Sequence, residues 1–381
     1  MRLTFSEIKN KIRKIVPEGT EYDVDLEAGS ISVITKDPAS FGGAGGQSLT
    51  VKIAKAIRRR VVIRPHPDLL SSESEVNDAV SRIMPEEALI RRIWLDPALS
   101  EVTIEADDPK SAVGQKGANI QQLRNEIGWL VNVVRAPARE SRTQTDIRRF
   151  RKELADERKT LLRKFGTRIY RPQRPGPSWV RVTALGSYRE VGRAMHLVTT
   201  NESKVLVDCG AKPTNNRSEV QPFFAAPEML PLDNIDAVVI THAHVDHIGM
   251  LPVLFRYGYK GPVYCTQPTR DLMTLLQMDY IKVAQAEGNE APYSKSDIQE
   301  CIKHVVDVNW GEKTDIAPDI KITMENAGHI LGSSSVYMQI GEGRTEHKLL
   351  FSGDIKYEKS WLFDAATVRF NKVDTLVIES T

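Results

Sequence analysis

Apolar positions follow two different spacings along the first 135 residues, and the same succession of elements occurs twice. Spacings of three or four residues, as at Phe5, Ile8 and Ile12, predict helices, whereas short apolar runs bounded by turn residues predict strands. The first round is a helix from Phe5, strands at 22–25 and 30–35, a helix at 49–60 and a strand at 61–64; the second is a helix at 75–84, strands at 90–95 and 101–105, a helix at 111–127 and a strand at 130–135. This repetition predicts two related α/β modules, residues 1–68 and 69–137.

The pattern changes after residue 137. The spacing of Ile147, Leu154 and Leu161 predicts one helix of several turns, and a linker rich in Pro, Gly and Arg follows, so that residues 138–178 form a helix and linker. From residue 179 to residue 381, strands at 179–185, 194–200 and 204–209 come first, and helices and strands alternate afterwards. That order is typical of a layered α/β sandwich.

Composition limits the class of protein. In 381 residues, 41% are hydrophobic and 27% are charged, which leaves room for two or three cores. No apolar run approaches the roughly 18 residues that span a bilayer, and the first residues lack the apolar stretch of a signal peptide, so we expect a cytoplasmic protein with no membrane partner. Three widely spaced cysteines, Cys209, Cys265 and Cys301, indicate neither a disulfide framework nor a thiolate metal site.

Positive charge is concentrated in one segment. The net charge of the chain is only +2, but residues 135–174 hold fourteen Lys or Arg and five Asp or Glu, a local net charge of +9. Such a basic stripe suits a polyanion, because each neutralised phosphate releases counterions. A solvated helix face is the alternative that the sequence leaves open.

A short glycine motif stands in the second module, at Gly114, Gln115, Lys116 and Gly117. Its glycines would let a nucleic-acid backbone approach helix amides, and Lys116 adds a positive charge. The arrangement resembles the GxxG loop of the KH domain, which clamps single-stranded nucleic acid; a tight turn without a ligand is the alternative. In the first module, residues 42–46 are glycine-rich without a basic residue, so we expect a KH-like module that does not grip RNA in the same way.

A cluster of possible metal ligands follows the apolar strand at 237–240. His242, His244, Asp246 and His247 offer imidazoles and a carboxylate from one tight loop, as a zinc site with a position left open for water requires. The hexad from residue 242 to residue 247 resembles the signature of the metallo-β-lactamase superfamily. The further motifs of that superfamily match, in order, Asp208, His329 and Asp354.

The resemblance implies an αββα sandwich that binds two zinc ions. His242, His244 and His329 would hold one ion, Asp246 and His247 the other, and Asp354 would lie between them, so that the pair could clamp an in-line phosphoryl displacement. In the same way Asp246 is implied to be catalytic, and Asp208 to brace the metal loop. No metal is assigned to the other histidines, which are His66, His196, His304 and His347.

Glu379, at the end of the last predicted strand, indicates which branch of the superfamily the chain resembles. The sequence Glu379-Ser380-Thr381 resembles the acidic motif that begins the β-CASP insertion of nucleic-acid-processing members, where the carboxylate orients a general-acid histidine. The general acid, the last zinc ligand and the β-CASP cap would lie beyond Thr381 in that family. We therefore expect these 381 residues to be a fragment that cleaves RNA slowly or not detectably by itself.

Two KH-like modules ahead of such a core resemble the archaeal homologues of the endonuclease subunit of the cleavage and polyadenylation specificity factor. The resemblance implies zinc-dependent endonucleolytic cleavage of single-stranded RNA, with 5′-to-3′ exonucleolytic cleavage left open, in RNA 3′-end formation and transcription termination. RNA polymerase and elongation factors as partners, and a homodimer of the full-length protein, are implied in the same way. The alternatives are a hydrolase of a small ester, thioester or amide, and an RNA-binding factor with a vestigial metal site.

Overall fold

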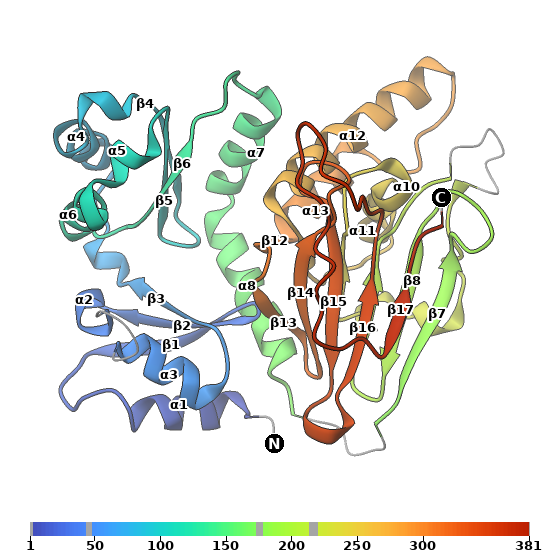
Figure 1. Cartoon of the computed structure of the whole chain (residues 1–381), viewed down its shortest axis with the longest axis horizontal. Helices are drawn as coiled ribbons and strands as arrows, with labels where there is room; N and C mark the ends of the chain where they lie inside the picture. The colour runs from blue at the N-terminus through green and yellow to red at the C-terminus, as the bar shows by residue number, and fades with distance from the viewer. Residues whose placement is uncertain (1–2, 43–47, 173–177, 213–219, 381) are drawn as a thin grey trace. The chain divides into compact units, whose positions relative to one another are not determined.

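The computed structural model describes residues 3–42, 48–172, 178–212 and 220–380. The chain divides into two compact units, of which one comprises residues 5–163 and the other, within the described part of the chain, residues 3–4 and 164–380. The first unit contains two modules and the start of a helical segment (Figure 1). Its elements are α1 Phe5–Arg13, β1 Tyr22–Glu27, β2 Ser30–Thr35, α2 Pro38–Phe41, α3 Leu49–Ile57, β3 Val61–Pro65, α4 Glu73–Ile83, β4 Ile90–Asp96, β5 Glu101–Ala106, α5 Pro109–Val113, α6 Ala118–Ile127, β6 Leu130–Arg135 and α7 Arg142–Glu153, followed by α8 Ala155–Ile169, which continues into the second unit.

The two modules have the same strand order and directions, as the repeated pattern predicted. In each, the first two strands pair antiparallel and the third pairs parallel with the second, in the orders β1-β2-β3 and β4-β5-β6. Apolar residues of α4, α6 and the sheet form the core of the second module, where Val76, Ile104 and Leu123 are fully buried. Apart from Gly42, the glycine-rich stretch of the first module lies outside the described residues.

The GxxG motif interrupts the helix that the spacing predicted at 111–127, so the prediction of one continuous helix is wrong. The φ angles of Gly114, Lys116 and Gly117 are 74°, 50° and 81°. Backbone in the left-handed region cannot continue a right-handed helix, so α5 ends at Val113 and α6 begins at Ala118. The motif is therefore an exposed loop between two helices, and both Gln115 and Lys116 are exposed at its tip.

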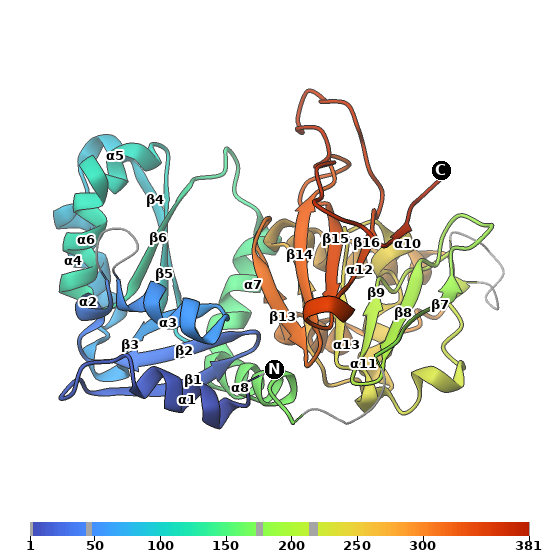
Figure 2. The ribbon, with the colours of Figure 1, turned by 60° about the horizontal axis from the view of Figure 1, so that its bottom comes forward.

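The basic segment forms two helices, not the one predicted, because the helix breaks at Leu154 between α7 and α8. Along β4, Ile93 and Leu95 face the core beneath α4 and α6, so Trp94 faces the other side of the sheet, which α7 covers (Figure 2). The Arg148 guanidinium of α7 stacks 4.9 Å from the centre of the Trp94 ring. Helix α7 of the basic segment thus completes the packing of the second module.

The second unit is a sandwich of two sheets. Its elements are β7 Val180–Gly186, β8 Met195–Thr200, β9 Lys204–Val207, β10 Ala237–Val239, α10 Val245–Ile248, α11 Leu251–Arg256, β11 Val263–Cys265, α12 Gln267–Ala286, α13 Lys295–His304, β12 Val305–Asp307, β13 Lys313–Ala317, β14 Ile320–Asn326, β15 Ser334–Ile340, β16 His347–Phe351 and β17 Thr375–Val377. One sheet has the order β12-β11-β10-β9-β8-β7 and the other the order β13-β14-β15-β16-β17.

Alternating side chains explain the layers of the sandwich. Val205 and Val207 of β9 join residues of the second sheet, such as Ile322, in one core between the sheets. Leu206 points the opposite way and is also fully buried, so a further layer covers that face of the six-stranded sheet. Helices α10 to α13 belong to this part of the unit (Figure 1). The predicted α/β sandwich is confirmed.

Parallel strands bring distant residues to one edge of the six-stranded sheet. β9 and β10 pair in parallel, with Val207 opposite Val239, so the residues that follow both strands lie side by side. The long loop between β16 and β17 extends beyond the strand ends (Figure 2). In the part of the chain that the structure describes, no helix has the length and apolar character needed to cross a membrane.

Candidate metal centre

The loop after β10 carries most of the predicted ligands and is fixed by backbone hydrogen bonds from a neighbouring segment. The Cys209 amide donates to the His247 carbonyl at 2.8 Å, and the Ala211 amide donates to the Val245 carbonyl at 2.9 Å. Between them Gly210 passes so close to the loop that a Cβ atom there would lie 1.5 Å from the Asp246 carbonyl oxygen. Only glycine fits at this position.

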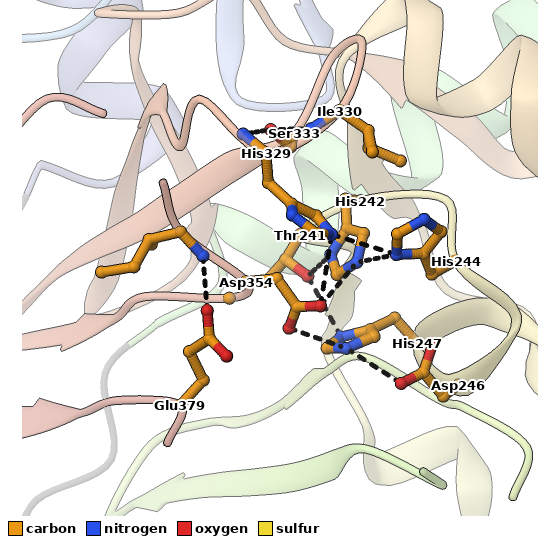
Figure 3. A network of polar contacts seen from close by, with 12 residues as sticks. Thr241, His242, His244, Asp246, His247, His329, Ile330, Ser333, Asp354 and Glu379 are labelled. Carbon is orange, nitrogen blue, oxygen red and sulfur yellow. Dashed lines mark hydrogen bonds and ion pairs between the residues drawn. The ribbon is translucent and has the colours of Figure 1, made fainter. Parts of the chain in front are cut away.

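Four side chains converge at this edge of the sheet: His242, His244, His329 and Asp354 offer donor atoms that all lie within 4.8 Å of one another. Figure 3 shows the three imidazoles and the carboxylate pointing toward a common centre. His244 Nδ1 lies 3.1 Å from both His242 Nε2 and His329 Nε2, and Asp354 Oδ2 lies 3.5 Å from His242 Nε2 and 3.3 Å from His329 Nε2.

These separations fit a metal ion. A tetrahedral zinc ion with ligand distances of about 2.0–2.1 Å holds its ligand atoms about 3.3 Å apart. Hydrogen bonds alone fit the cluster less well, because a single Nδ1 of His244 faces two imidazole nitrogens at once. Burial lowers the pKa of His242 to about 4, and burial together with the neighbouring His329 lowers the pKa of His244. Both rings are therefore neutral at pH 7, the form that ligates metals.

Asp354 faces a second set of donors with its other oxygen. Its Oδ1 lies 3.2 Å from His247 Nε2, which in turn lies 3.7 Å from Asp246 Oδ2. Burial raises the pKa of Asp354, but hydrogen bonds from His242 and His247 outweigh that effect and hold the pKa far below its usual range. The carboxylate is thus ionised and directs one oxygen to each donor set, which is the arrangement expected of a bridging ligand.

Asp208 and Thr241 orient two of the ligands, His247 and His242, through hydrogen bonds. Asp208 Oδ2 lies 2.8 Å from His247 Nδ1, and Asp208 accepts hydrogen bonds from the Thr241 amide and hydroxyl at 2.8 Å each. The Thr241 hydroxyl also lies 3.0 Å from His242 Nδ1. With Nδ1 of His247 directed at a carboxylate, Nε2 is left to face the second donor set.

The same carboxylates govern the charge of His247. Burial lowers the pKa of His247, but the Asp208 and Asp354 carboxylates outweigh burial and raise the pKa to about 10. A metal ion bound to Nε2 would therefore compete with a proton. Asp208 itself has a φ of 59°, an uncommon backbone conformation for a residue other than glycine, at the point where β9 ends.

Two further residues brace the ligands that come from the second sheet. The Ser333 hydroxyl accepts hydrogen bonds from the His329 and Ile330 amides, each at 3.2 Å. Glu379 Oε1 accepts a hydrogen bond from the Ile355 amide at 2.9 Å, next to Asp354 (Figure 3). The structure therefore places Glu379 beside the loop that carries Asp354. Thr241, Ser333 and Gly210 were missed by sequence reasoning; only their position next to predicted motifs could have marked them.

A cleft of about 500 Å³ opens beside the second donor set. Asp246, His247 and Asp354 line it, together with the loop at 187–192 and the residues at 377–380 that include Glu379. The loop at 187–192 carries no motif and was not predicted from the sequence. The centre is thus accessible to a ligand from the side of Asp246, whose side chain is 30% exposed.

The remaining candidates lie elsewhere. Gly114 to Gly117 belong to the first unit, and within the described residues Lys116 makes no ion pair or hydrogen bond. Away from this centre, the described residues contain no group of three or more His, Cys, Asp or Glu side chains close enough to hold a metal. The other histidines and the three cysteines are outside it, and burial raises the pKa of Cys209, Cys265 and Cys301, which opposes thiolate formation.

Comparison with known sequence families agrees with this architecture. Residues 197–377 match the family described as "Metallo-beta-lactamase superfamily domain", and residues 2–70 match the family described as "Transcription termination factor FttA, KH domain". The first module is therefore a KH domain, and the metal cluster lies in a metallo-β-lactamase domain. Solved metallo-β-lactamases resemble the fold only weakly: Rm3 metallo-beta-lactamase, at 19% identity, covers 48% of this chain and 62% of its own with a TM-score of 0.31.

Several archaeal proteins share nearly the whole chain. A protein from Methanosarcina mazei named "Transcription termination factor FttA" is 43% identical over 98% of this chain and 58% of its own length. Proteins of the same name from Methanocaldococcus jannaschii and from a Lokiarchaeum are 41% and 38% identical over 98% and 97% of this chain. The chain spans between half and two thirds of the length of these curated relatives.

Proposed function

The chain belongs to the archaeal family of these relatives, and on that premise we propose that it hydrolyses phosphodiester bonds of single-stranded RNA with two zinc ions. One observation carries the proposal: within a metallo-β-lactamase domain, the Asp354 carboxylate directs one oxygen to each of two donor sets. The name of the relatives extends the proposal to transcription termination, and the family resemblance of the sequence motifs adds RNA 3′-end formation and RNA polymerase as a partner.

The distances support one assignment of residues to the two ions. His242, His244 and His329 would hold the first ion with Asp354, and Asp246 and His247 would hold the second with the other oxygen of Asp354. Nitrogen and oxygen donors in this number suit zinc. When bound, the two ions would neutralise charge on a phosphodiester and activate water for attack on phosphorus.

The chain's own side chains would set up that chemistry. Asp208 fixes the orientation of His247 and, through Thr241, that of His242. Glu379 holds the backbone next to Asp354. Asp246 faces the cleft with a partly exposed carboxylate that can also accept a proton during the reaction.

We propose that the GxxG loop of the second module supplies separate RNA contacts. Gln115 and Lys116 are exposed at the loop tip, and Gly117 has open space where a side chain would otherwise stand. A nucleic-acid backbone could therefore approach the start of α6 closely, with Lys116 beside a phosphate.

The test is incubation of zinc-loaded protein with 5′-labelled single-stranded RNA, with protein in excess and long reaction times. We expect chelator-sensitive cleavage that falls at least about 100-fold in Asp246→Ala, because the loss of an orienting partner alone costs a metal site 10–100-fold. Asp279→Ala, at an exposed aspartate on α12, is the matched control. The sizes of the labelled products separate internal cleavage from trimming at the 5′ end.

Two outcomes would contradict the proposal. RNA cleavage that persists in Asp246→Ala or after chelation would show that another site or a contaminant acts. Hydrolysis of a small thioester by zinc-loaded protein, without any cleavage of RNA, would favour a small-molecule hydrolase instead.

A further inference from the structure

The cleft beside the metal centre is strongly acidic. Among the residues that line it, five carry carboxylates, and these are Glu190, Asp208, Asp246, Asp354 and Glu379. Two divalent metal ions would offset four of these five negative charges at the centre itself, and the phosphates on either side of the cleaved bond would need a cation of the protein. Arg189 is the only Lys or Arg among the described residues that line the cleft.

The charge of Arg189 is available, whereas the cations next to it are engaged. Glu190 pairs with Arg193 at 2.5 Å and with Lys212 at 2.9 Å. Arg189 is exposed and makes no ion pair or hydrogen bond with another described residue. Its guanidinium therefore offers its donors to a ligand in the cleft.

The loop that carries Arg189 is anchored to the site. Tyr188 packs edge-on against His196 with ring centres 5.5 Å apart, and His196 packs against Phe351 at 5.4 Å, on the strand that leads to Asp354. At the base of the loop, Gly186 lies so near the Arg193 carbonyl that a Cβ atom would stand 2.1 Å from the oxygen.

The backbone of this loop adopts uncommon conformations. Ser187, Arg189 and Arg193 have φ angles of 70°, 62° and 45°. Such angles in residues other than glycine persist where the surroundings determine the conformation, and they occur preferentially where a ligand is bound. The backbone that carries Arg189 at the cleft is thus held in a defined conformation.

We propose that Arg189 binds a backbone phosphate of the nucleic-acid substrate, next to the phosphodiester that is cleaved. This inference rests on the proposed function and names a contact that gives the acidic cleft affinity for a polyanion. The planar guanidinium can donate two parallel hydrogen bonds to a phosphate, which an ammonium group cannot do. Arg189 is therefore a substrate-binding residue and takes no part in holding the metal ions.

The experiment compares Arg189→Ala and Arg189→Lys with Arg181→Ala, an exposed arginine on β7 outside the cleft lining. All proteins carry Gln115→Asp and Lys116→Asp, so that the GxxG loop does not mask binding at the cleft. Fluorescence anisotropy measures the binding of a labelled six-nucleotide RNA to zinc-loaded protein at several salt concentrations. Cleavage of that RNA is measured alongside hydrolysis of bis(p-nitrophenyl) phosphate, a phosphodiester without neighbouring phosphates.

We expect Arg189→Ala to weaken RNA binding about tenfold, as loss of a charged hydrogen-bonding partner does. The slope of the logarithm of the binding constant against the logarithm of salt concentration should become shallower by roughly 0.7, the value for one phosphate contact. Arg189→Lys should keep the salt dependence and regain part of the affinity, and Arg181→Ala should match the parent. RNA cleavage should suffer more than hydrolysis of the small phosphodiester.

Unchanged RNA affinity in Arg189→Ala would overturn the inference, as would an equal loss in Arg181→Ala. The parent protein decides the proposed function separately. If it cleaves RNA and Arg189→Ala binds and cleaves equally well, only the role of Arg189 fails. If it hydrolyses neither RNA nor bis(p-nitrophenyl) phosphate but Arg189→Ala still weakens binding tenfold, the phosphate contact stands and the proposed phosphodiester hydrolysis fails.

Discussion

The basic segment and the metal cleft use charge in opposite ways. Residues 135–174 carry a local net charge of +9, yet most of their described arginines pair with carboxylates of the protein. Arg158 is 3% exposed and pairs with Asp96, Arg163 pairs with Asp25, and Arg168 and Arg171 both pair with Asp236. Among the described residues, the lining of the cleft holds five carboxylates and one Lys or Arg side chain, that of Arg189.

The difference shows that charge density along a sequence does not measure the charge that a ligand meets. The basic stripe suggested a polyanion site, with a solvated helix face as the alternative. In the structure, many of its Lys and Arg side chains instead form ion pairs with carboxylates of the protein. The carboxylates of the cleft are scattered between residues 190 and 379, and sequence motifs marked Asp208, Asp246, Asp354 and Glu379 but not Glu190. Whether a charged side chain can bind a ligand depends on its ion-pair partners, and the fold determines which partners it has.

The largest effect should follow from the loss of one cleft carboxylate, that of Asp354. We expect Asp354→Ala to lower the zinc content from about two ions per chain to one or fewer and to lower RNA cleavage at least about 100-fold, since both donor sets lose an oxygen. Elemental analysis and the labelled-RNA assay measure the two effects, with Asp279→Ala as the control. A variant that keeps both ions would show that Asp354 does not bridge.

A smaller effect should follow when a carboxylate orients a ligand without contacting a metal. Asp208→Asn removes the charge behind His247 and Thr241 but keeps the size of the side chain. We expect zinc affinity to fall about 10–100-fold in a titration against a chromophoric chelator. Asp279→Asn should have no effect. Equal zinc affinity in Asp208→Asn and the unmodified chain would remove Asp208 from the metal centre.

Stability should separate the paired from the unpaired cations of the basic segment. Arg158→Ala leaves Asp96 without its two hydrogen bonds of 2.9 and 3.0 Å, and we expect a loss of about 1–3 kcal/mol in the free energy of unfolding of the first unit. Arg149, which is exposed on α7 and has no contact of this kind among the described residues, should tolerate alanine. Urea unfolding followed by circular dichroism compares them; equal losses would mean that the pairing with Asp96 contributes little.

The smallest effect should appear in RNA affinity at the GxxG loop. Gln115→Asp and Lys116→Asp together place negative charge at the loop tip, and we expect RNA to bind about tenfold more weakly with a flatter salt dependence and unchanged zinc content. Lys9→Asp with Asn10→Asp makes the same change of charge on exposed positions of α1 and serves as the control. Equal affinities in the two double variants would refute a role for the loop.

Local pattern was enough to predict much of this molecule. The strands predicted at 30–35 and 130–135 match β2 and β6, because each is a short run rich in apolar residues between turns. The helix breaks at Gly114 and Leu154 were missed, because the helical spacing of apolar residues continues across both positions although the backbone there is not helical. The domain match supports the metallo-β-lactamase fold that the hexad at 242–247 suggested.

Pairing over long distances was beyond sequence reasoning. The partners of Arg148, Arg158 and Arg163 lie 43, 62 and 138 residues away along the chain, so no local window could show that these charges are neutralised. Arg189 could not be predicted from the sequence for the same reason. It lies among carboxylates only because β7 and β8 pair and bring the loop between them to the cleft. The predicted ligands were easier to find, since four of them lie within six residues.

The central claim is that His242, His244, His329, Asp354, Asp246 and His247 bind two metal ions through nitrogen and oxygen alone. X-ray absorption at the zinc edge, with elemental analysis of the same zinc-loaded sample, tests it most directly. We predict about two zinc ions per chain, a single shell of light ligands at about 2.0–2.1 Å and no sulfur shell. A protein that retains no zinc, or a sulfur shell at about 2.3 Å, would contradict it.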